Sequence, residues 1–170
     1  LNITNAEIIH DIHRKYLEAG SDIIETNTFG ANSISQSEYG LGGYAREMNL
    51  KAAQIATKAV SEQMGKNPDW PRFVAGAIGP TNKTLSSSED VEDASFRSIT
   101  FDELRDSYQE QAIALIEGGV DLILIETVFD VLNAKAAIVA TLNAFEDTGV
   151  SLPIMVSVTM EATGTMLIGT

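Results

Sequence analysis

The sequence has no cysteine, few basic residues and no long apolar run. Without cysteine, these 170 residues cannot form a disulfide, supply a thiolate nucleophile or bind a metal through sulfur. Eleven Lys and Arg against 24 Asp and Glu give a formal net charge of −13, which argues against binding to a nucleic-acid backbone. No apolar run approaches the ~18 residues that a membrane span needs, and these residues contain no signal-peptide pattern. We therefore expect a cytoplasmic protein with neither nucleic acid nor membrane among its partners.

The sequence does contain an alternation of helix-like and strand-like segments. Helical periodicity predicts helices over about 4–20, 44–64, 100–117 and 131–147. Two of them begin with the spacing of a capping box, Thr4-x-x-Glu7 and Thr100-x-x-Glu103. Strands rich in β-branched residues are predicted over 22–27 and 72–78, in a segment ending at 126, and over 154–159. The element order is therefore α-β-α-β-α-β-α-β.

This order indicates an α/β fold with a parallel sheet and right-handed crossovers. No glycine-rich nucleotide loop follows the first strand, so a barrel is favoured over a doubly wound sheet. A complete (β/α)₈ TIM barrel needs ~250 residues. We therefore predict a partial barrel of about four parallel strands with outer helices. Leu1 is not an initiator methionine, and residues 1–170 are expected to be a fragment of a single barrel domain.

The strand after Asp22 and the strand after Asp121 repeat one pattern. Counting from each Asp, Asn27 and Glu126 are both the fifth residue on. Side chains alternate between the two faces of a strand. One face therefore carries Ile23, Glu25 and Asn27 on the first strand, and Leu122, Leu124 and Glu126 on the second. If this face is the barrel interior, Asn27 and Glu126 lie at its mouth, where barrels bind ligands.

Three further features each have two interpretations. His10 and His13 lie three residues apart, but no matching ligand accompanies them, so a solvated helix face is favoured over a metal site. Gly76 and Gly79 permit close approach of a ligand or a neighbouring strand, or are small residues that fill a barrel strand. The polar segment 81–98 is too long for a simple connection, and loops of this kind are usually functional or mobile.

Three stretches of the chain resemble the homocysteine S-methyltransferase family. They are SDIIETNTFGANSISQSEYG at 21–40, VAGAIGPTNKTL at 74–85 and GVDLILIETVFDVLNAKAA at 119–137. They occur in the family's order and are most similar to the homocysteine-binding domain of cobalamin-dependent methionine synthases. The resemblance implies a zinc-dependent barrel that binds homocysteine and methylates its sulfur to give methionine. It also implies cobalamin and methyltetrahydrofolate bound by other domains, although nothing in these residues selects the methyl donor.

The resemblance assigns roles to four residues. Glu126 matches the acidic residue that holds the substrate ammonium; the alternative is a carboxylate that caps the following helix. Asn27 and Thr28 either line the pocket or hold the loop. Glu25 points into the barrel, as a ligand contact or as a member of a buried network.

Two parts of the family pattern are missing from these residues. The first barrel strand, with its Asp-Gly motif, would precede Leu1, and the three zinc-binding cysteines would follow Thr170. We therefore assign no catalytic residue and no metal ligand here, and expect the fragment to be inactive. Its open barrel edges predict self-association. Two alternatives stay open: another barrel enzyme such as a lyase or aldolase, and a non-catalytic structural domain.

Overall fold

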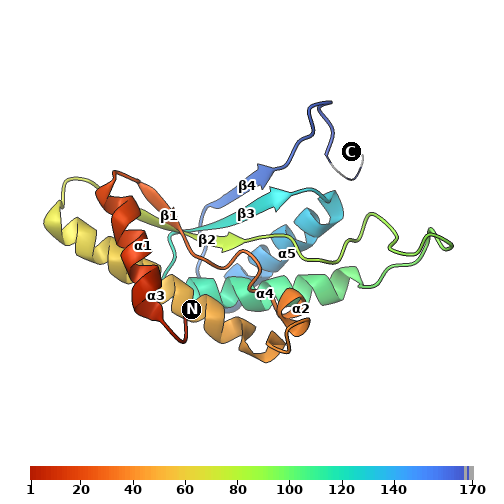
Figure 1. Ribbon diagram of the computed structural model, residues 1–170, viewed down its shortest axis with the longest axis horizontal. Coiled ribbons are helices and arrows are strands. Elements are labelled where there is room, and N and C mark those ends of the chain that lie inside the picture. Colours follow the sequence, from red (N-terminus) through yellow and green to blue (C-terminus); the bar gives the residue numbers. More distant parts are fainter. Residues whose placement is uncertain (167, 169–170) are drawn as a thin grey trace.

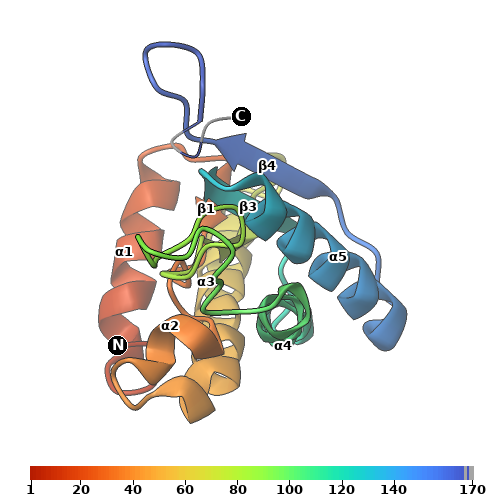
Figure 2. The same ribbon diagram turned by 90° about the vertical axis from the view of Figure 1, so that its right-hand side faces the viewer.

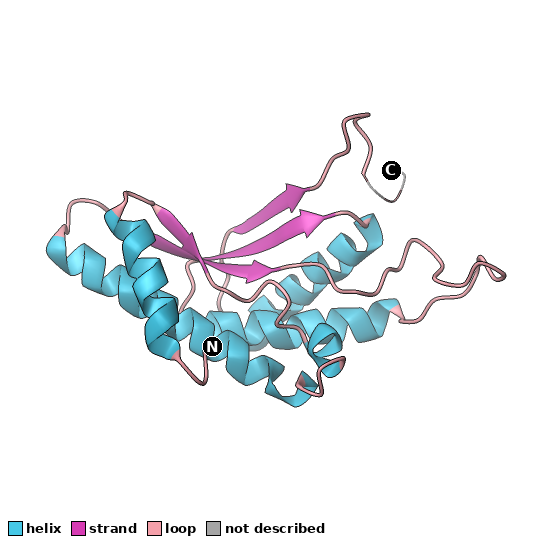
Figure 3. Ribbon diagram, viewed as in Figure 1, coloured by secondary structure: helices cyan, strands magenta, loops and turns pink. Residues whose placement is uncertain are grey.

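The computed structural model describes residues 1–166 and 168. One parallel sheet has the strand order β1-β2-β3-β4 (Figure 1). The strands are β1 (Ile23–Glu25), β2 (Phe73–Ile78), β3 (Leu122–Val128) and β4 (Ile154–Val158). The longer helices are α1 (Ala6–Glu18), α3 (Ala45–Lys66), α4 (Phe101–Glu117) and α5 (Val131–Thr148). All four lie on one side of the sheet (Figure 3), which confirms the predicted partial barrel with outer helices.

The core fills the space between the helices and the sheet. Leu17, Ile78, Leu104, Leu115 and Ile123 are among its fully buried side chains. A separate, smaller cluster of Ala75, Leu122 and Leu124 covers the opposite face of the sheet. That opposite face corresponds to the inside of the barrel, and three of the four predicted site residues, Glu25, Asn27 and Glu126, belong to it.

The two predicted capping boxes have different outcomes. The box at Thr100 and Glu103 is confirmed, because each side chain bonds to the other residue's backbone N–H. The box at Thr4 and Glu7 is wrong: α1 begins at Ala6, and its N-cap residue Asn5 makes no side-chain capping bond. The physical reason is a turn that the Asn5 N–H closes by donating to the Leu1 carbonyl at 2.7 Å, with Thr4 inside it.

One face of α1 is exposed although its pattern is apolar. Ile8, Ile12 and Tyr16 are 44–63% exposed, whereas Ile9 and Leu17 are buried. The opposite edge of the sheet, at β4, is also open, and Met155, Val156, Val158 and Met160 are each about half exposed. Figure 2 shows β4 at the rim of the sheet, with α5 reaching under only part of it.

No helix among residues 1–166 and 168 is long and apolar enough to cross a membrane.

Two short elements, α2 (Ser33–Ser37) and the 3₁₀ helix η1 (Gly42–Tyr44), follow β1. The stretch 81–98 contains no helix or strand, as predicted, and projects from the end of β2 (Figure 1). Gly76 in β2 and Gly79 just after it both lie where neighbouring atoms pack too closely for a side chain. A Cβ at Gly79 would lie 2.6 Å from the Phe29 carbonyl oxygen, and a Cβ at Gly76 would press on Leu115 and Val120.

Candidate functional site

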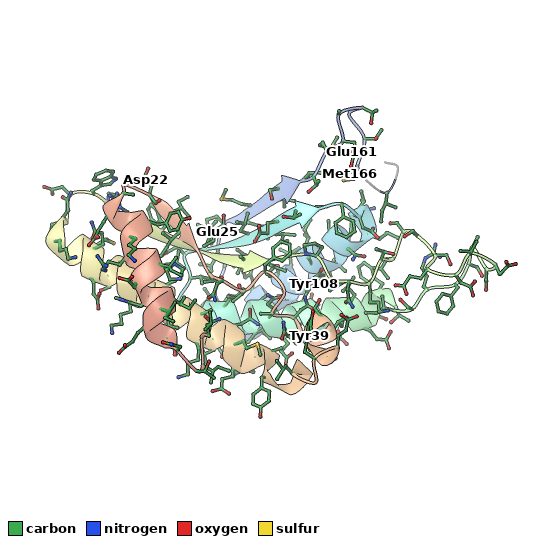
Figure 4. The ribbon with its side chains drawn as sticks, viewed as in Figure 1. Asp22, Glu25, Tyr39, Tyr108, Glu161 and Met166 are labelled. Atoms are coloured by element: carbon green, nitrogen blue, oxygen red, sulfur yellow. The ribbon has the colours of Figure 1, made fainter. Side chains whose placement is uncertain are left out.

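Three of the four predicted site residues line one cavity at the β1 edge of the sheet. Burial alternates along β1 and the residues that follow it: Ile24, Thr26 and Thr28 are buried, whereas Glu25 and Asn27 are exposed. A cavity of about 590 Å³ is lined by Glu25, Asn27 and, from β3, Glu126, and also by Ile12, His13 and Tyr16 of α1. Figure 4 marks Glu25 on the side of β1 away from α3 and α4. The period-2 argument therefore brings together side chains that are far apart in the sequence.

The cavity is unfavourable for an ionised Glu126 unless a cation is present. Partial burial raises the pKa of Glu126, and the negative charge of Glu25 raises it further. The Thr127 side chain opposes this shift and lowers the pKa of Glu126 through a hydrogen bond. A cation between the two carboxylates would relieve both unfavourable effects. The arrangement therefore suits an ammonium group, which also forms strong charge-assisted hydrogen bonds.

Glu25 is exposed, so the structure does not place it in a buried network. Thr28 differs from its neighbours, because its side chain is completely buried on the other face of the strand. Its hydroxyl donates to the Ala77 carbonyl at 2.6 Å and lies 2.7 Å from the Thr26 hydroxyl. The sequence left two interpretations open for Thr28, a pocket residue and a residue that holds the loop. The structure favours the second.

The N-cap of α5 is Asp130, not Glu126. The Asp130 carboxylate accepts hydrogen bonds from the backbone N–H groups of Leu132 and Asn133. It also accepts bonds from the Leu85 N–H at 3.0 Å, the Ser86 N–H at 2.9 Å and the Ser86 hydroxyl at 2.5 Å. Glu126 is thus not used as the helix cap and lines the cavity instead.

Sequence reasoning missed this role of Asp130, which is 2% exposed. Burial acts to raise the pKa of Asp130, but the bonds from Ser86, Asn133 and Leu132 outweigh it, and the pKa lies below its usual range. The signal available in the sequence was an Asp directly before a helical pattern, which is a typical N-cap. Its partners 44 and 45 residues earlier carried no such signal.

The residues present do not fit a zinc site. No group of three or more His, Cys, Asp or Glu side chains that could hold a metal occurs among residues 1–166 and 168. The interpretation of His10 and His13 as a solvated helix face is wrong for His13, which is only 6% exposed. Burial, and then the nearby His10, lower the pKa of His13. His10 Nε2 lies 3.0 Å from a carboxylate oxygen of Glu62 on α3.

Beyond Glu126, β3 departs from regular pairing. Ile125 pairs with Val156 and Val128 pairs with Val158, so two residues of β3 stand opposite the single residue Ser157. The extra residue is a β-bulge. The bulge shifts the alternation of side chains between the two faces by one residue. Val128 therefore points to the helix side of the sheet and packs in the core.

Comparisons with known proteins show the family of the chain and relatives of its fold. The sequence model of a family described as homocysteine S-methyltransferase matches residues 1–170. The fold is similar to the metallated form of the homocysteine methyltransferase MmuM from Escherichia coli, with a TM-score of 0.79 and 22% sequence identity. That match covers 99% of this chain and 57% of the other. The oxidized form of the same protein gives a TM-score of 0.79 at 21% identity, covering 99% and 56%. The apo form gives 0.72 at 20%, covering 99% and 55%. The chain thus spans little more than half the length of these relatives.

Proposed function

Because the chain belongs to the homocysteine S-methyltransferase family, we propose that the full-length protein transfers a methyl group to the sulfur of homocysteine, giving methionine. The observation that carries this proposal is the cavity beside β1, where Glu126 of β3 joins Glu25 and the negative charge of Glu25 acts on Glu126. Two such carboxylates suit the ammonium of an amino acid. No Lys lies in any of the four strands, so nothing favours the Schiff-base chemistry of an aldolase.

In this proposal Glu126 accepts hydrogen bonds from the substrate ammonium. Glu25 adds a second negative charge on the same side of the cavity, and the amide of Asn27 serves polar groups of the amino acid at the end of β1. Thr28 acts through the loop, because its buried hydroxyl fixes the backbone that presents Asn27. These residues bind and orient the substrate, and none of them carries out the transfer.

The chemistry at sulfur is assigned to parts of the protein outside these residues. Zinc, which would hold the substrate sulfur as a thiolate, is proposed to be bound by cysteines that this chain does not contain. Methionine synthase is the proposed type of enzyme, with cobalamin and methyltetrahydrofolate bound by other domains. It follows that residues 1–170 alone should be inactive.

We also propose that residues 1–170 form part of one barrel domain and lack its first and its C-terminal strands. Two observations support this: the match covers 57% of the similar structure, and the strands at both rims of the sheet are open on one side. At β4, Met155 and Val156 leave apolar surface next to an unpaired strand. Such edges promote association, so the isolated chain is expected to bind other copies of itself.

The substitution Glu126→Gln in the full-length protein tests the proposed function. Removing the charge while keeping the shape should cost about 1.5–3 kcal/mol of binding free energy. This corresponds to roughly 10- to 150-fold weaker homocysteine binding in calorimetry. The metal content should not change, since Glu126 is proposed to face the amine. Glu146→Gln, the same change on the exposed face of α5, is the matched control. Wild-type affinity in Glu126→Gln would remove this residue from the site.

A further inference from the structure

The bulge in β3 lies directly beside the residue that is proposed to bind the ammonium. Glu126 and Thr127 together occupy the space opposite Ser157. The Thr127 N–H, which the bulge removes from the regular ladder, donates to the Ser157 hydroxyl oxygen at 3.1 Å. Ser157 is two residues beyond Met155, the partner of Leu124, and so belongs to the same inner face of the sheet. A side chain therefore replaces the backbone acceptor at this point.

Thr127 has an unfavourable backbone conformation. Its φ is +58°, and it is the one residue other than glycine with positive φ among residues 1–166 and 168. A β-branched residue rarely adopts this left-handed region. Such strain persists only where the surroundings enforce it, and it concentrates at functional sites. Here it coincides with a bulge in a parallel pair of strands, where bulges are uncommon.

The strained residue also contacts the carboxylate. The Thr127 hydroxyl acts on the neighbouring Glu126 carboxyl as a hydrogen-bonding group, which lowers the pKa of Glu126 and favours its ionised form. A glycine would adopt the same φ without strain but would lose this hydroxyl. The choice of threonine over glycine is therefore unfavourable for stability and favourable for the ionised state of Glu126.

We propose that Thr127 and Ser157 are positioning residues that direct the Glu126 carboxylate at the substrate ammonium. This proposal rests on the proposed function. Ser157 fixes the backbone of the bulge through the Thr127 N–H, and Thr127 orients the carboxylate through its own side chain. The pair therefore determines how well the site distinguishes an amino acid from the same thiol without its amino group.

The experiment compares two ligands on variants of the full-length protein by calorimetry. The ligands are homocysteine and 4-mercaptobutyrate, which is homocysteine without the amino group. The variants are Thr127→Gly, Ser157→Ala and the conservative Ser157→Thr, with Glu126→Gln as the reference. Ser151→Ala, an exposed serine just before β4, is the matched control. The measured quantity is the ratio of the two dissociation constants.

Thr127→Gly and Ser157→Ala should reduce the preference for homocysteine on the order of tenfold, with little change for 4-mercaptobutyrate. Ser157→Thr keeps the hydroxyl and should restore most of the preference, and Ser151→Ala should match the wild type. The melting temperature of Thr127→Gly should not fall, because glycine relieves the strain.

Three results would overturn the proposal. If Glu126→Gln keeps the wild-type preference, both the proposed function and the positioning roles fail. If only Glu126→Gln loses the preference, Thr127 and Ser157 do not position it. Equal weakening of both ligands in Thr127→Gly and Ser157→Ala would show a general structural role instead.

Discussion

Replacement of Asp130 tests how the loop 81–98 is attached to the barrel. Asp130→Ala removes the helix cap of α5, which is worth about 1 kcal/mol. It also leaves the Ser86 N–H without its acceptor, at about 1–3 kcal/mol, whereas the Leu85 N–H keeps a second bond to Asn133 Oδ1 at 3.1 Å. The total, about 2–4 kcal/mol, reaches above the usual range for a single substitution. Asp130→Asn keeps one oxygen and the shape, so about half of this loss is expected.

Urea unfolding of the full-length protein gives the change in stability, and hydrogen exchange at the Leu85 and Ser86 amides locates it. Exchange at these two amides should accelerate in both Asp130 variants. Asp93→Asn is the control, because Asp93 is an exposed aspartate of the same loop that bonds locally to Ser95. Unchanged unfolding and unchanged exchange in Asp130→Ala would refute the reasoning.

The dependence on pH has a definite sign. Hydrogen bonds hold the pKa of Asp130 below its unfolded value of ~3.9, so the folded state favours the carboxylate. This stabilisation is complete above the unfolded pKa and is lost as the pH falls through the folded pKa. The wild type should therefore lose stability more steeply below pH ~4 than Asp130→Asn does.

Two further predictions concern α1 and the open edges. Burial, followed by the nearby His10, lowers the pKa of His13, so this residue contributes stability above its unfolded pKa of ~6.5 that declines as the pH falls through the folded pKa. His13→Leu should flatten the unfolding free energy between pH 7 and 5, and an unchanged slope would contradict this. Residues 1–170 expressed alone should sediment as dimers or larger species, because Met155 and its neighbours are exposed beside an unpaired strand. A monomer that unfolds cooperatively at high urea would argue against that interpretation.

The part of the site that followed from the sequence depends on local rules. Strand residues alternate between faces whatever the rest of the fold does, so Glu25, Asn27 and Glu126 could be assigned to one face by counting. The repeat around Asp22 and Asp121 has a structural counterpart. The Asp22 carboxylate accepts from the Trp70 indole N–H at 2.6 Å, and the Asp121 carboxylate accepts from the Val74 N–H at 2.7 Å. Asp121 thus attaches the start of its strand to β2, and Asp22 attaches the start of its strand to the residues just before β2.

The features that the sequence did not predict depend on distant partners. His13 is buried because α1 packs against α3, and a helical period cannot distinguish that face from the exposed one with Ile12. The counting rule also ends at Glu126. An extra residue opposite Ser157 exchanges the two faces for the side chains that follow it. Nothing in the sequence Glu-Thr-Val indicates that the threonine has a positive φ. Pairing with β4 determines the bulge, and β4 begins about thirty residues later in the chain.

The bulge and the cap of α5 act on the same short segment. Residues 126–130 leave the regular sheet after Ile125 and end at the fixed carboxylate of Asp130. One end is therefore held by β4 through Ser157, and the other by the loop 81–98 through Ser86. A segment fixed at both ends can keep Thr127 in a conformation that it would otherwise leave. The contacts that fix the direction of the Glu126 side chain thus lie outside the cavity. The residues that make these contacts therefore do not need to touch the substrate.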